Sequence, residues 1–206
     1  STLPPIAIFE ADYVEPEPGK FDFRWLELGL KLLNGHGISY LPVLGGNCFY
    51  INTASWAPKA YPLWFEQVAR KGKSVSKGHP MLIPPDPVWR RYVRNLAAHA
   101  GKRIMQYEIF NEAQFQVSPE MYNGFLKSAY EEIRKENPRA RIVGFCSTSD
   151  KGEDIGLFAR RCFEFGGLEL ADAVSFHPYA SRELGSVEPA DRQIASLKGL
   201  IRKHNR

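Results

Sequence analysis

The chain has 206 residues, of which 44% are hydrophobic, and this is enough to bury a substantial core and to exclude an intrinsically disordered protein. Its net charge of +4 is mild, and the basic residues are scattered over expected helical surfaces, so we expect no nucleic-acid partner. No apolar run reaches the roughly 18 residues of a membrane span, and no signal-peptide pattern assigns a compartment, so we expect no membrane partner.

The first part of the chain predicts a strand, a helix and a second strand. Residues 6–9 are a short apolar strand candidate. A turn-rich loop over residues 15–23 leads to a helix that Asp22 would cap and that Asn34-Gly35 would end. Residues 38–44 form the next strand candidate, and a unit of this length fits a right-handed crossover between parallel strands.

The middle of the chain contains a long excursion and then two helices around one strand. Residues 48–85 are rich in aromatic residues and proline, and a connection this long is usually functional or partly helical. Asp86 as the cap and Pro87 in the first turn predict the start of a helix that Gly101 ends. Residues 104–112 alternate between apolar and polar side chains, which is typical of a strand. Ser118-Pro119 predicts the start of the following helix.

The last part of the chain repeats the same alternation. Residues 141–145 and 172–179 are strand candidates, each followed by a helix. Five strands that alternate with helices predict one α/β domain over residues 1–206 with a parallel sheet. No strand runs into the Gly-rich phosphate turn of a doubly wound sheet, which favours a (β/α)8 TIM-type barrel, incomplete at about five β/α units.

Glu112 is the strongest candidate for chemistry because it follows directly on a predicted strand. In a parallel α/β barrel the carboxyl ends of the strands carry the active site. If the odd positions of the strand face helices, Glu108 and Glu112 face the barrel axis, and we expect Glu108 to pair with a basic residue of a neighbouring strand. Asn111 breaks the alternation, so a bulge or a strong twist is needed to aim Asn111 and Glu112 at one ligand.

A second polar group ends the strand over residues 172–179. Ser175, His177 and Tyr179 have the same parity, so they share one face of that strand. The five histidines and three cysteines show no metal-ligand spacing, so we expect no metal and no cofactor. No Gly-x-Ser-x-Gly turn presents a nucleophilic serine. A carboxylate mechanism, in which one carboxyl protonates a leaving oxygen and a second attacks or activates water, is the chemistry that remains.

Three motifs resemble the clan A retaining glycoside hydrolases, and among these the β-xylosidase and α-L-iduronidase family most of all. Residues 107–113, Tyr-Glu-Ile-Phe-Asn-Glu-Ala, resemble the strand-four signature Tyr-Glu-Ile-Trp-Asn-Glu-Pro of that clan. Residues 15–23 resemble its loop after strand two, and residues 175–179 resemble its strand six. The departures at Phe110 and Ala113 fall on positions that shape the turn, and an arginine that many relatives carry on strand two is missing around residues 6–10.

The resemblance implies a hydrolase that cleaves O-glycosidic bonds of oligosaccharides or polysaccharides, with a carbohydrate as its partner. Glu112 would be the general acid/base, and Asn111 would hydrogen-bond the sugar 2-hydroxyl. His177 and Tyr179 would line the subsite where cleavage occurs. Asn47 and Trp56 lie where the strand-three loop of the family meets sugar.

By this alignment the chain holds strands two to six, and the nucleophile glutamate of the family, at the end of strand seven, would follow Arg206. Five strands cannot close an eight-stranded barrel, so we expect a fragment of a longer enzyme that is inactive alone. Glu10 and Glu183 are weaker candidates for the second carboxyl. Two alternatives stay open, namely a non-catalytic carbohydrate-binding barrel and an unrelated α/β protein in which Glu112 is structural.

Overall fold

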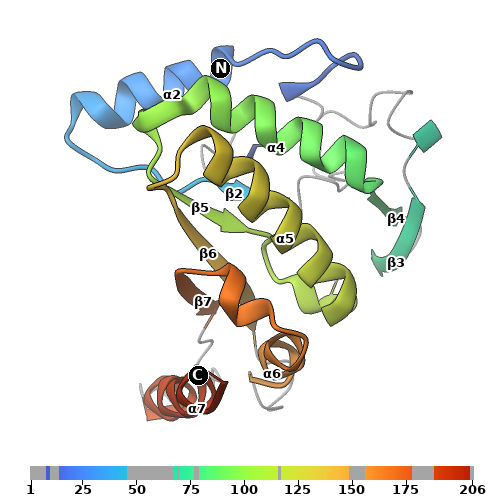
Figure 1. Cartoon of the computed structure of the whole chain (residues 1–206), viewed down its shortest axis with the longest axis vertical. Coiled ribbons are helices and arrows are strands. Elements are labelled where there is room, and N and C mark those ends of the chain that lie inside the picture. The colour runs from blue at the N-terminus through green and yellow to red at the C-terminus, as the bar shows by residue number, and fades with distance from the viewer. Residues whose placement is uncertain are drawn as a thin grey trace.

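Five parallel strands form the centre of the molecule (Figure 1). The computed structural model describes residues 8–9, 14–45, 67–68, 70–76, 79–115, 117–148, 156–177 and 188–204. The order in the sheet is β1-β2-β5-β6-β7, and every neighbouring pair is parallel. The strands are β1 (Ile8–Phe9), β2 (Val43–Leu44), β5 (Gln106–Ile109), β6 (Arg141–Thr148) and β7 (Ala173–His177). Strands that follow the chain order from one edge to the other confirm the barrel topology, because the order of a doubly wound sheet reverses about a crevice.

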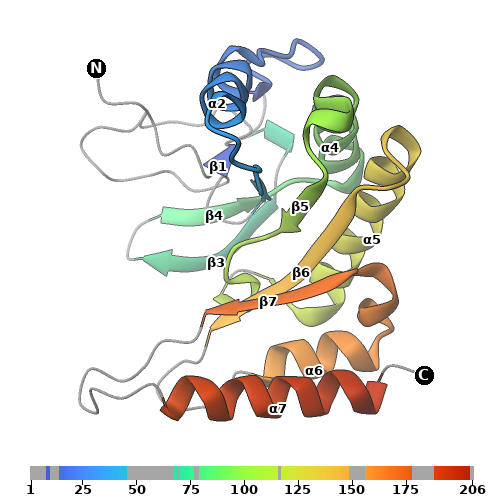
Figure 2. The same cartoon turned by 90° about the vertical axis from the view of Figure 1, so that its left-hand side faces the viewer.

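Among the described elements, a helix follows each strand of this sheet before the next sheet strand begins. The helices are α2 (Arg24–Gly35), α4 (Asp86–Ala100), α5 (Pro119–Glu136), α6 (Gly156–Glu164) and α7 (Glu188–His204). Figure 2 shows them arranged around the outside of the sheet, with α4 contacting α5, α5 contacting α6 and α6 contacting α7. No described helix combines the length and the apolar composition that a bilayer crossing requires.

The alternation along β5 separates its two faces as the sequence predicts. The side chains of Tyr107 and Ile109 are fully buried, whereas Gln106 and Glu108 are partly exposed. The hydroxyl of Tyr122 on α5 donates to the carbonyl oxygen of Ile109 at 3.0 Å, which ties the helix to the strand. The odd face of β5 therefore packs toward the helices, and Glu108 lies on the opposite face of the sheet.

The predicted helix ends agree with the structure at three positions, including the end of α2 at Gly35, and two predicted caps differ. Ser118 caps α5 by accepting a hydrogen bond from the backbone N–H of Met121, and Gly101 ends α4 at φ +55°. Asp22 and Asp86 are not the cap residues, because the N-caps of α2 and α4 are Phe23 and Pro85. The Asp22 carboxylate instead accepts from the Arg24 backbone N–H and guanidinium, and the Asp86 carboxylate accepts from Arg90 and Ser128.

The observed strands differ from the predicted ones in extent, and one pair of strands was not predicted. Of the predicted strand over residues 38–44, only Val43–Leu44 pairs with its neighbours. Strand β6 continues three residues beyond the predicted end at Phe145. The excursion after β2 contains an antiparallel hairpin, β3 (Arg70–Ser76) and β4 (His79–Ile83), that the sequence did not predict. The hairpin lies on the side of the molecule toward which β5 points (Figures 1 and 2).

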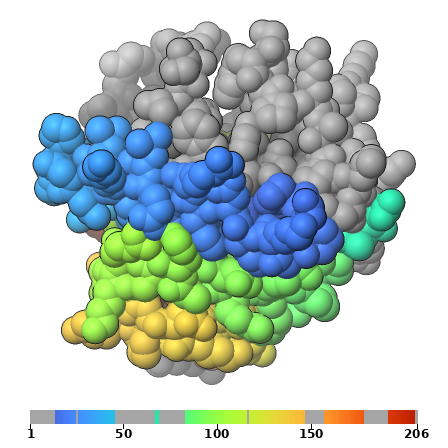
Figure 3. All heavy atoms as spheres, turned by 90° about the horizontal axis from the view of Figure 1, so that it is seen from above, coloured from blue at the N-terminus to red at the C-terminus, as the bar shows by residue number. Residues whose placement is uncertain are grey.

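Ion pairs attach the segment before α2 (residues 14–23) and α2 itself to α4 and the turn that follows it. Figure 3 shows this segment and α2 lying directly against α4. The Glu27 carboxylate of α2 lies 2.6 Å from Nε2 of His99 and accepts a hydrogen bond from Arg103 at 2.7 Å. Glu15, which is almost fully buried, accepts from Arg91 of α4 at 2.6 Å. These contacts fix the loop after β1 relative to the helices that cover the sheet.

Candidate active site

Two polar side chains from different strands meet at the carboxyl end of the sheet. His177 is the last residue of β7, and Glu112 lies three residues beyond the end of β5. Their side chains are separated by 2.8 Å between Nδ1 of His177 and Oε1 of Glu112, and they are 34% and 25% exposed. Strand β6 lies between β5 and β7, so the contact crosses the width of one strand. Both groups are thus held together while remaining accessible to a ligand.

The backbone after β5 adopts an unusual conformation that presents Glu112. Phe110 has φ +65° and Glu112 has φ +48°, and left-handed backbone is uncommon for residues other than glycine. The Phe110 side chain is buried, with its ring centroid 5.7 Å from that of Trp89 and 5.2 Å from that of Phe125. The buried ring anchors the turn, and Asn111 and Glu112 are both partly exposed. The distortion that the broken alternation required is therefore present.

Cys146 completes this cluster and was not expected there. Its sulfur lies 3.2 Å from Nε2 of His177 and 3.8 Å from Oδ1 of Asn111. Phe145 has φ +67°, and the pairing of β6 with β7 shifts register between Gly144 and Ser147. This irregularity lies at Cys146 itself, which is buried at the carboxyl end of β6. Burial raises the pKa of the Cys146 thiol to about 12, so the sulfur keeps its proton.

The ion pair that we expected for Glu108 is not found within the described part of the chain. Among the described residues, no arginine or lysine forms a salt bridge with it. Its charge instead acts on the neighbouring Cys146 thiol, whose pKa it helps to raise after the larger effect of burial. A second carboxylate thus lies on the same face of the sheet, close to the cluster around Glu112.

The structure brings three of the candidate residues together, namely Asn111, Glu112 and His177. Ser175 lies two residues before His177 in β7. Its hydroxyl donates to the carbonyl oxygen of Gly144 at 3.3 Å. Five other candidates lie outside the described residues: Glu10, Asn47, Trp56, Tyr179 and Glu183. Within the described ranges, no three histidine, cysteine, aspartate or glutamate side chains are grouped so that they could hold a metal ion.

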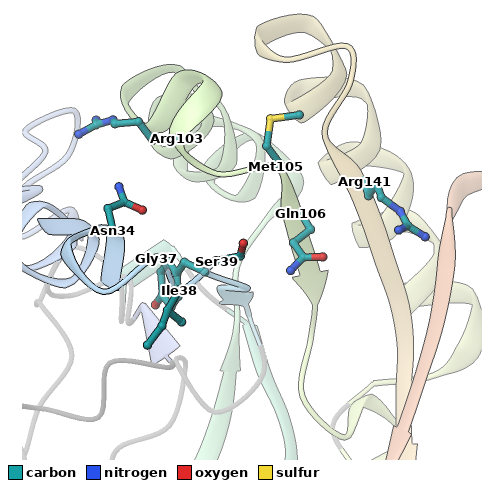
Figure 4. Close-up of a pocket in the computed structure, with 9 residues that line it drawn as sticks. Asn34, Gly37, Ile38, Ser39, Arg103, Met105, Gln106 and Arg141 are labelled. Carbon is teal, nitrogen blue, oxygen red and sulfur yellow. The ribbon is translucent and has the colours of Figure 1, made fainter. Parts of the chain in front are cut away.

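A cavity of about 430 Å³ lies at the opposite end of the sheet (Figure 4). Its lining includes Met105 and Gln106 at the start of β5 and Arg141 at the start of β6. Another basic lining residue, Arg103, donates to Glu27 at 2.7 Å. In parallel barrels the amino ends of the strands serve stability and the carboxyl ends carry the chemistry. None of its described lining residues is a carboxylate, so Glu112 remains the candidate for chemistry.

Solved structures show where this architecture recurs, although no protein-family model and no curated protein matches the chain. A family 39 glycoside hydrolase from the gut symbiont Bacteroides cellulosilyticus WH2 is 21% identical with a TM-score of 0.58, covering 85% of this chain and 32% of that enzyme. A glucosidase from Croceicoccus marinus is 10% identical with a TM-score of 0.64, covering 92% and 36%. A psychrophilic family 10 endo-β-1,4-xylanase is 10% identical with a TM-score of 0.59, covering 93% and 60%.

These similarities establish the fold. The chain has the TIM-type α/β barrel architecture of glycoside hydrolases, and the described sheet supplies five of its parallel strands. The chain spans about a third of the first two enzymes and 60% of the xylanase. The matches thus show the fold that the expected resemblance implies, and they do not single out the β-xylosidase and α-L-iduronidase family.

Proposed function

We propose that the chain forms part of the catalytic barrel of a retaining glycoside hydrolase, with Glu112 as its general acid/base. The observation that carries this proposal is the 2.8 Å contact between Glu112 and His177 at the carboxyl ends of two parallel strands. Asn111 lies beside it, so a carboxyl, an amide and an imidazole converge where barrel enzymes do their chemistry. The fold shared with several glycoside hydrolases supports the same assignment.

In the proposed reaction Glu112 acts twice. It first protonates the glycosidic oxygen as the bond to the leaving group breaks, while a second carboxylate attacks the anomeric carbon and forms a glycosyl-enzyme. It then removes a proton from the water that hydrolyses this intermediate. Retention requires the two carboxyls to be about 5–5.5 Å apart. We place the second carboxylate at the end of a seventh strand that follows residue 206, as the strand count of the resemblance implies.

The neighbouring side chains would hold the sugar. Asn111 would bind the 2-hydroxyl, an interaction that strengthens as positive charge develops on the ring. His177 and Tyr179 would line the subsite where cleavage occurs. Asn47 and Trp56 would contact sugar from the loop after β2, where an indole face suits the apolar side of a pyranose ring. The substrate class is accordingly an oligosaccharide or polysaccharide with an O-glycosidic bond.

The leaving group of the substrate tests the role of Glu112. In the full-length protein we expect Glu112→Ala to spare aryl glycosides with activated leaving groups and to slow those with poor leaving groups by about 10²-fold or more. An activated phenolate departs without a proton, whereas a poor leaving group depends on the acid. Glu131→Ala, on the exposed side of α5, is the matched control and should leave both rates unchanged.

Two results would contradict the proposal. Equal losses on activated and poor leaving groups would remove the acid role from Glu112. Binding of oligosaccharides by the full-length protein without any turnover would instead favour a non-catalytic carbohydrate-binding barrel.

A further inference from the structure

The hydroxyl of Tyr122 on α5 lies between two strands near the carboxyl end of the sheet. It donates to the carbonyl oxygen of Ile109 on β5 at 3.0 Å and accepts from the backbone N–H of Phe145 on β6 at 2.6 Å. A carbonyl oxygen can only accept and an amide N–H can only donate, so the direction of both hydrogen bonds is fixed. Burial raises the pKa of the fully buried Tyr122 well above its ordinary value, so the hydroxyl keeps the proton that it donates.

The hydroxyl takes the place of a hydrogen bond of the sheet. The N–H of Arg141 at the start of β6 donates to the carbonyl oxygen of Met105 at 2.8 Å, and the register between the two strands holds for the next two residues. Parallel strands repeat such a bond at every second residue, so the N–H of Phe145, four residues on, would donate directly to Ile109. The hydroxyl stands between these two groups instead, and the pairing of β5 with β6 has ended before them.

The separation is confined to one edge of β5. On its other edge the N–H of Phe110 donates to the carbonyl oxygen of Leu44 on β2 at 2.7 Å, so this ladder continues past the point where β6 leaves. Gly144 on β6 leaves room for the hydroxyl, because a Cβ at this position would lie 3.3 Å from it. β5 is therefore held by β2 on one side and spaced from β6 by the hydroxyl on the other.

The Tyr122 ring packs against two residues with left-handed backbone. Its centroid lies 6.1 Å from that of Phe110 and 5.6 Å from that of Phe145. These residues have φ +65° and φ +67°. Phe110 leads directly to Asn111 and Glu112, so the side chain that separates the two strands also supports the turn that presents the proposed acid.

We propose that Tyr122 is a positioning residue whose hydroxyl sets the spacing between the ends of β5 and β6 and thereby the placement of the Glu112 carboxyl, a role that rests on the proposed acid/base function of Glu112. Without the hydroxyl, the Phe145 N–H and the Ile109 carbonyl oxygen lose their partner in the core. A buried polar group without a partner is costly, so these two groups would bond to each other directly. The ends of β5 and β6 would then close, and Glu112 would shift relative to His177.

Tyr122→Phe removes the hydroxyl and keeps the ring. In the full-length protein we expect kcat/KM to fall about tenfold for poor leaving groups and less than about twofold for activated aryl glycosides, because a small misplacement of the acid slows only the reactions that depend on it. The ratio of the two rates on one sample does not depend on how much of the protein is folded, so a merely structural role would leave it unchanged.

A crystal structure of the full-length variant reads the position of the carboxyl directly. The distance between Nδ1 of His177 and Oε1 of Glu112 is 2.8 Å in the unmodified protein. In Tyr122→Phe we expect this distance to change by about 0.5 Å or more, which is the tolerance of a well-placed catalytic group.

Tyr107→Phe is the matched control. Tyr107 lies on β5 itself and is fully buried, and its hydroxyl has no hydrogen-bond partner among the described residues. Loss of this hydroxyl should leave both the substrate ratio and the position of Glu112 unchanged.

An unchanged contact between His177 and Glu112 in Tyr122→Phe would overturn the role of Tyr122 whatever the activity, even if a water molecule replaced the hydroxyl. A displaced carboxyl with an unchanged substrate ratio has two meanings, which Glu112→Ala separates. If Glu112→Ala changes the ratio, Tyr122 has no influence on catalysis and its positioning role is wrong. If Glu112→Ala lowers both rates equally, the proposed acid function fails, and the spacing of the two strands by Tyr122 remains.

Discussion

Two glutamates, Glu132 on α5 and Glu112 after β5, show how differently this chain treats a carboxylate. Glu132 is 1% exposed and accepts from Arg94 at 2.7 Å and from Arg90 at 3.1 Å. The hydrogen bond from Arg94 and then that from Arg90 lower the pKa of Glu132 to about 2, against the opposing effect of burial. Glu112 is 25% exposed, contacts an imidazole and stands on left-handed backbone.

This difference is what we expect between a carboxylate that stabilises the fold and the carboxyl that we propose for catalysis. A buried carboxylate surrounded by cations is fixed in its ionised form and holds two helices together. A partly exposed carboxyl that contacts a histidine remains accessible to a ligand. Strained backbone at the second site is typical of functional positions, where the surrounding structure stabilises it. Four sets of substitutions test this division of roles.

Glu112→Gln should have the largest effect, and it should fall on activity alone. We expect kcat/KM of the full-length protein for a poor leaving group to fall about 10³-fold, because an amide cannot donate the catalytic proton. The free energy of unfolding should change by less than about 0.5 kcal/mol, since the side chain is partly exposed and keeps its size. A large loss of stability measured by urea unfolding would show that Glu112 is structural.

Glu132→Gln should do the opposite of Glu112→Gln, because it should lower stability and leave activity unchanged. We expect the free energy of unfolding to fall by about 3 kcal/mol, because Arg90 and Arg94 lose the charge that they share in a buried position. Activity at temperatures where the variant is folded should be unchanged. Glu131→Gln, in which the replaced carboxylate is 33% exposed, should cost less than about 1 kcal/mol. Equal losses of unfolding free energy in Glu132→Gln and Glu131→Gln would contradict the special role of the buried carboxylate.

The stabilisation that the Glu132 carboxylate provides should be lost in acid. The pKa of Glu132 is about 2 in the folded chain and 4.5 in its ordinary range, so its stabilisation is complete above the ordinary value. It is lost as the pH falls from about 4.5 toward 2. The gap in unfolding free energy between the unmodified protein and Glu132→Gln should therefore shrink over this range. A difference in unfolding free energy that instead widens in acid would contradict this prediction.

Gly45→Ala should disturb the site through its supporting ring. Gly45 has φ +83°, and an added Cβ would lie 2.7 Å from two atoms of the Phe110 ring. We expect a loss of about 2–3 kcal/mol, combining backbone strain and overpacking, together with reduced activity because Phe110 anchors the turn before Glu112. Gly166→Ala has a similar φ of +78° and no atom within 4 Å, so it should cost about 1 kcal/mol and spare activity.

Ser118→Ala should have the smallest effect. The hydroxyl of Ser118 accepts from the backbone N–H of Met121 at 3.3 Å and caps α5. Its loss should lower the free energy of unfolding by about 1 kcal/mol and leave the leaving-group dependence unchanged. Restoration of stability by Ser118→Asp would confirm that capping, rather than packing, is responsible. A drop in activity without a loss of stability would place Ser118 in the site.

Much of the fold was predictable because its signals are local. The alternation over residues 104–109 assigned both faces of β5, and the cap at Ser118 and the glycine at Gly101 marked helix ends. The hairpin was missed because β3, Arg-Lys-Gly-Lys-Ser-Val-Ser, contains glycine and basic residues and has no apolar alternation. Its pairing with β4 depends on contacts between segments, which periodicity does not record.

The candidate site was predictable where strands end and not where one strand bends. Glu112 and His177 could be placed together because the carboxyl ends of parallel strands share one edge. Cys146 was not among the candidate residues, because the three cysteines show no metal-ligand spacing. Its only signal was the polar run Cys146-Ser147-Thr148 after an apolar strand. The left-handed residue and the register shift that aim it are products of tertiary packing.

Rescue of Glu112→Ala by azide tests the role of Glu112 most directly. Azide is a small anion that needs no general base, so it can attack a glycosyl-enzyme in the space that the missing carboxyl leaves. With an activated aryl glycoside and the full-length protein, we expect azide to accelerate turnover and to yield a glycosyl azide with the anomeric configuration of the substrate. Turnover of Glu112→Ala that is insensitive to azide, or a glycosyl azide of inverted configuration, would contradict the assignment of Glu112 as the acid/base of a retaining enzyme.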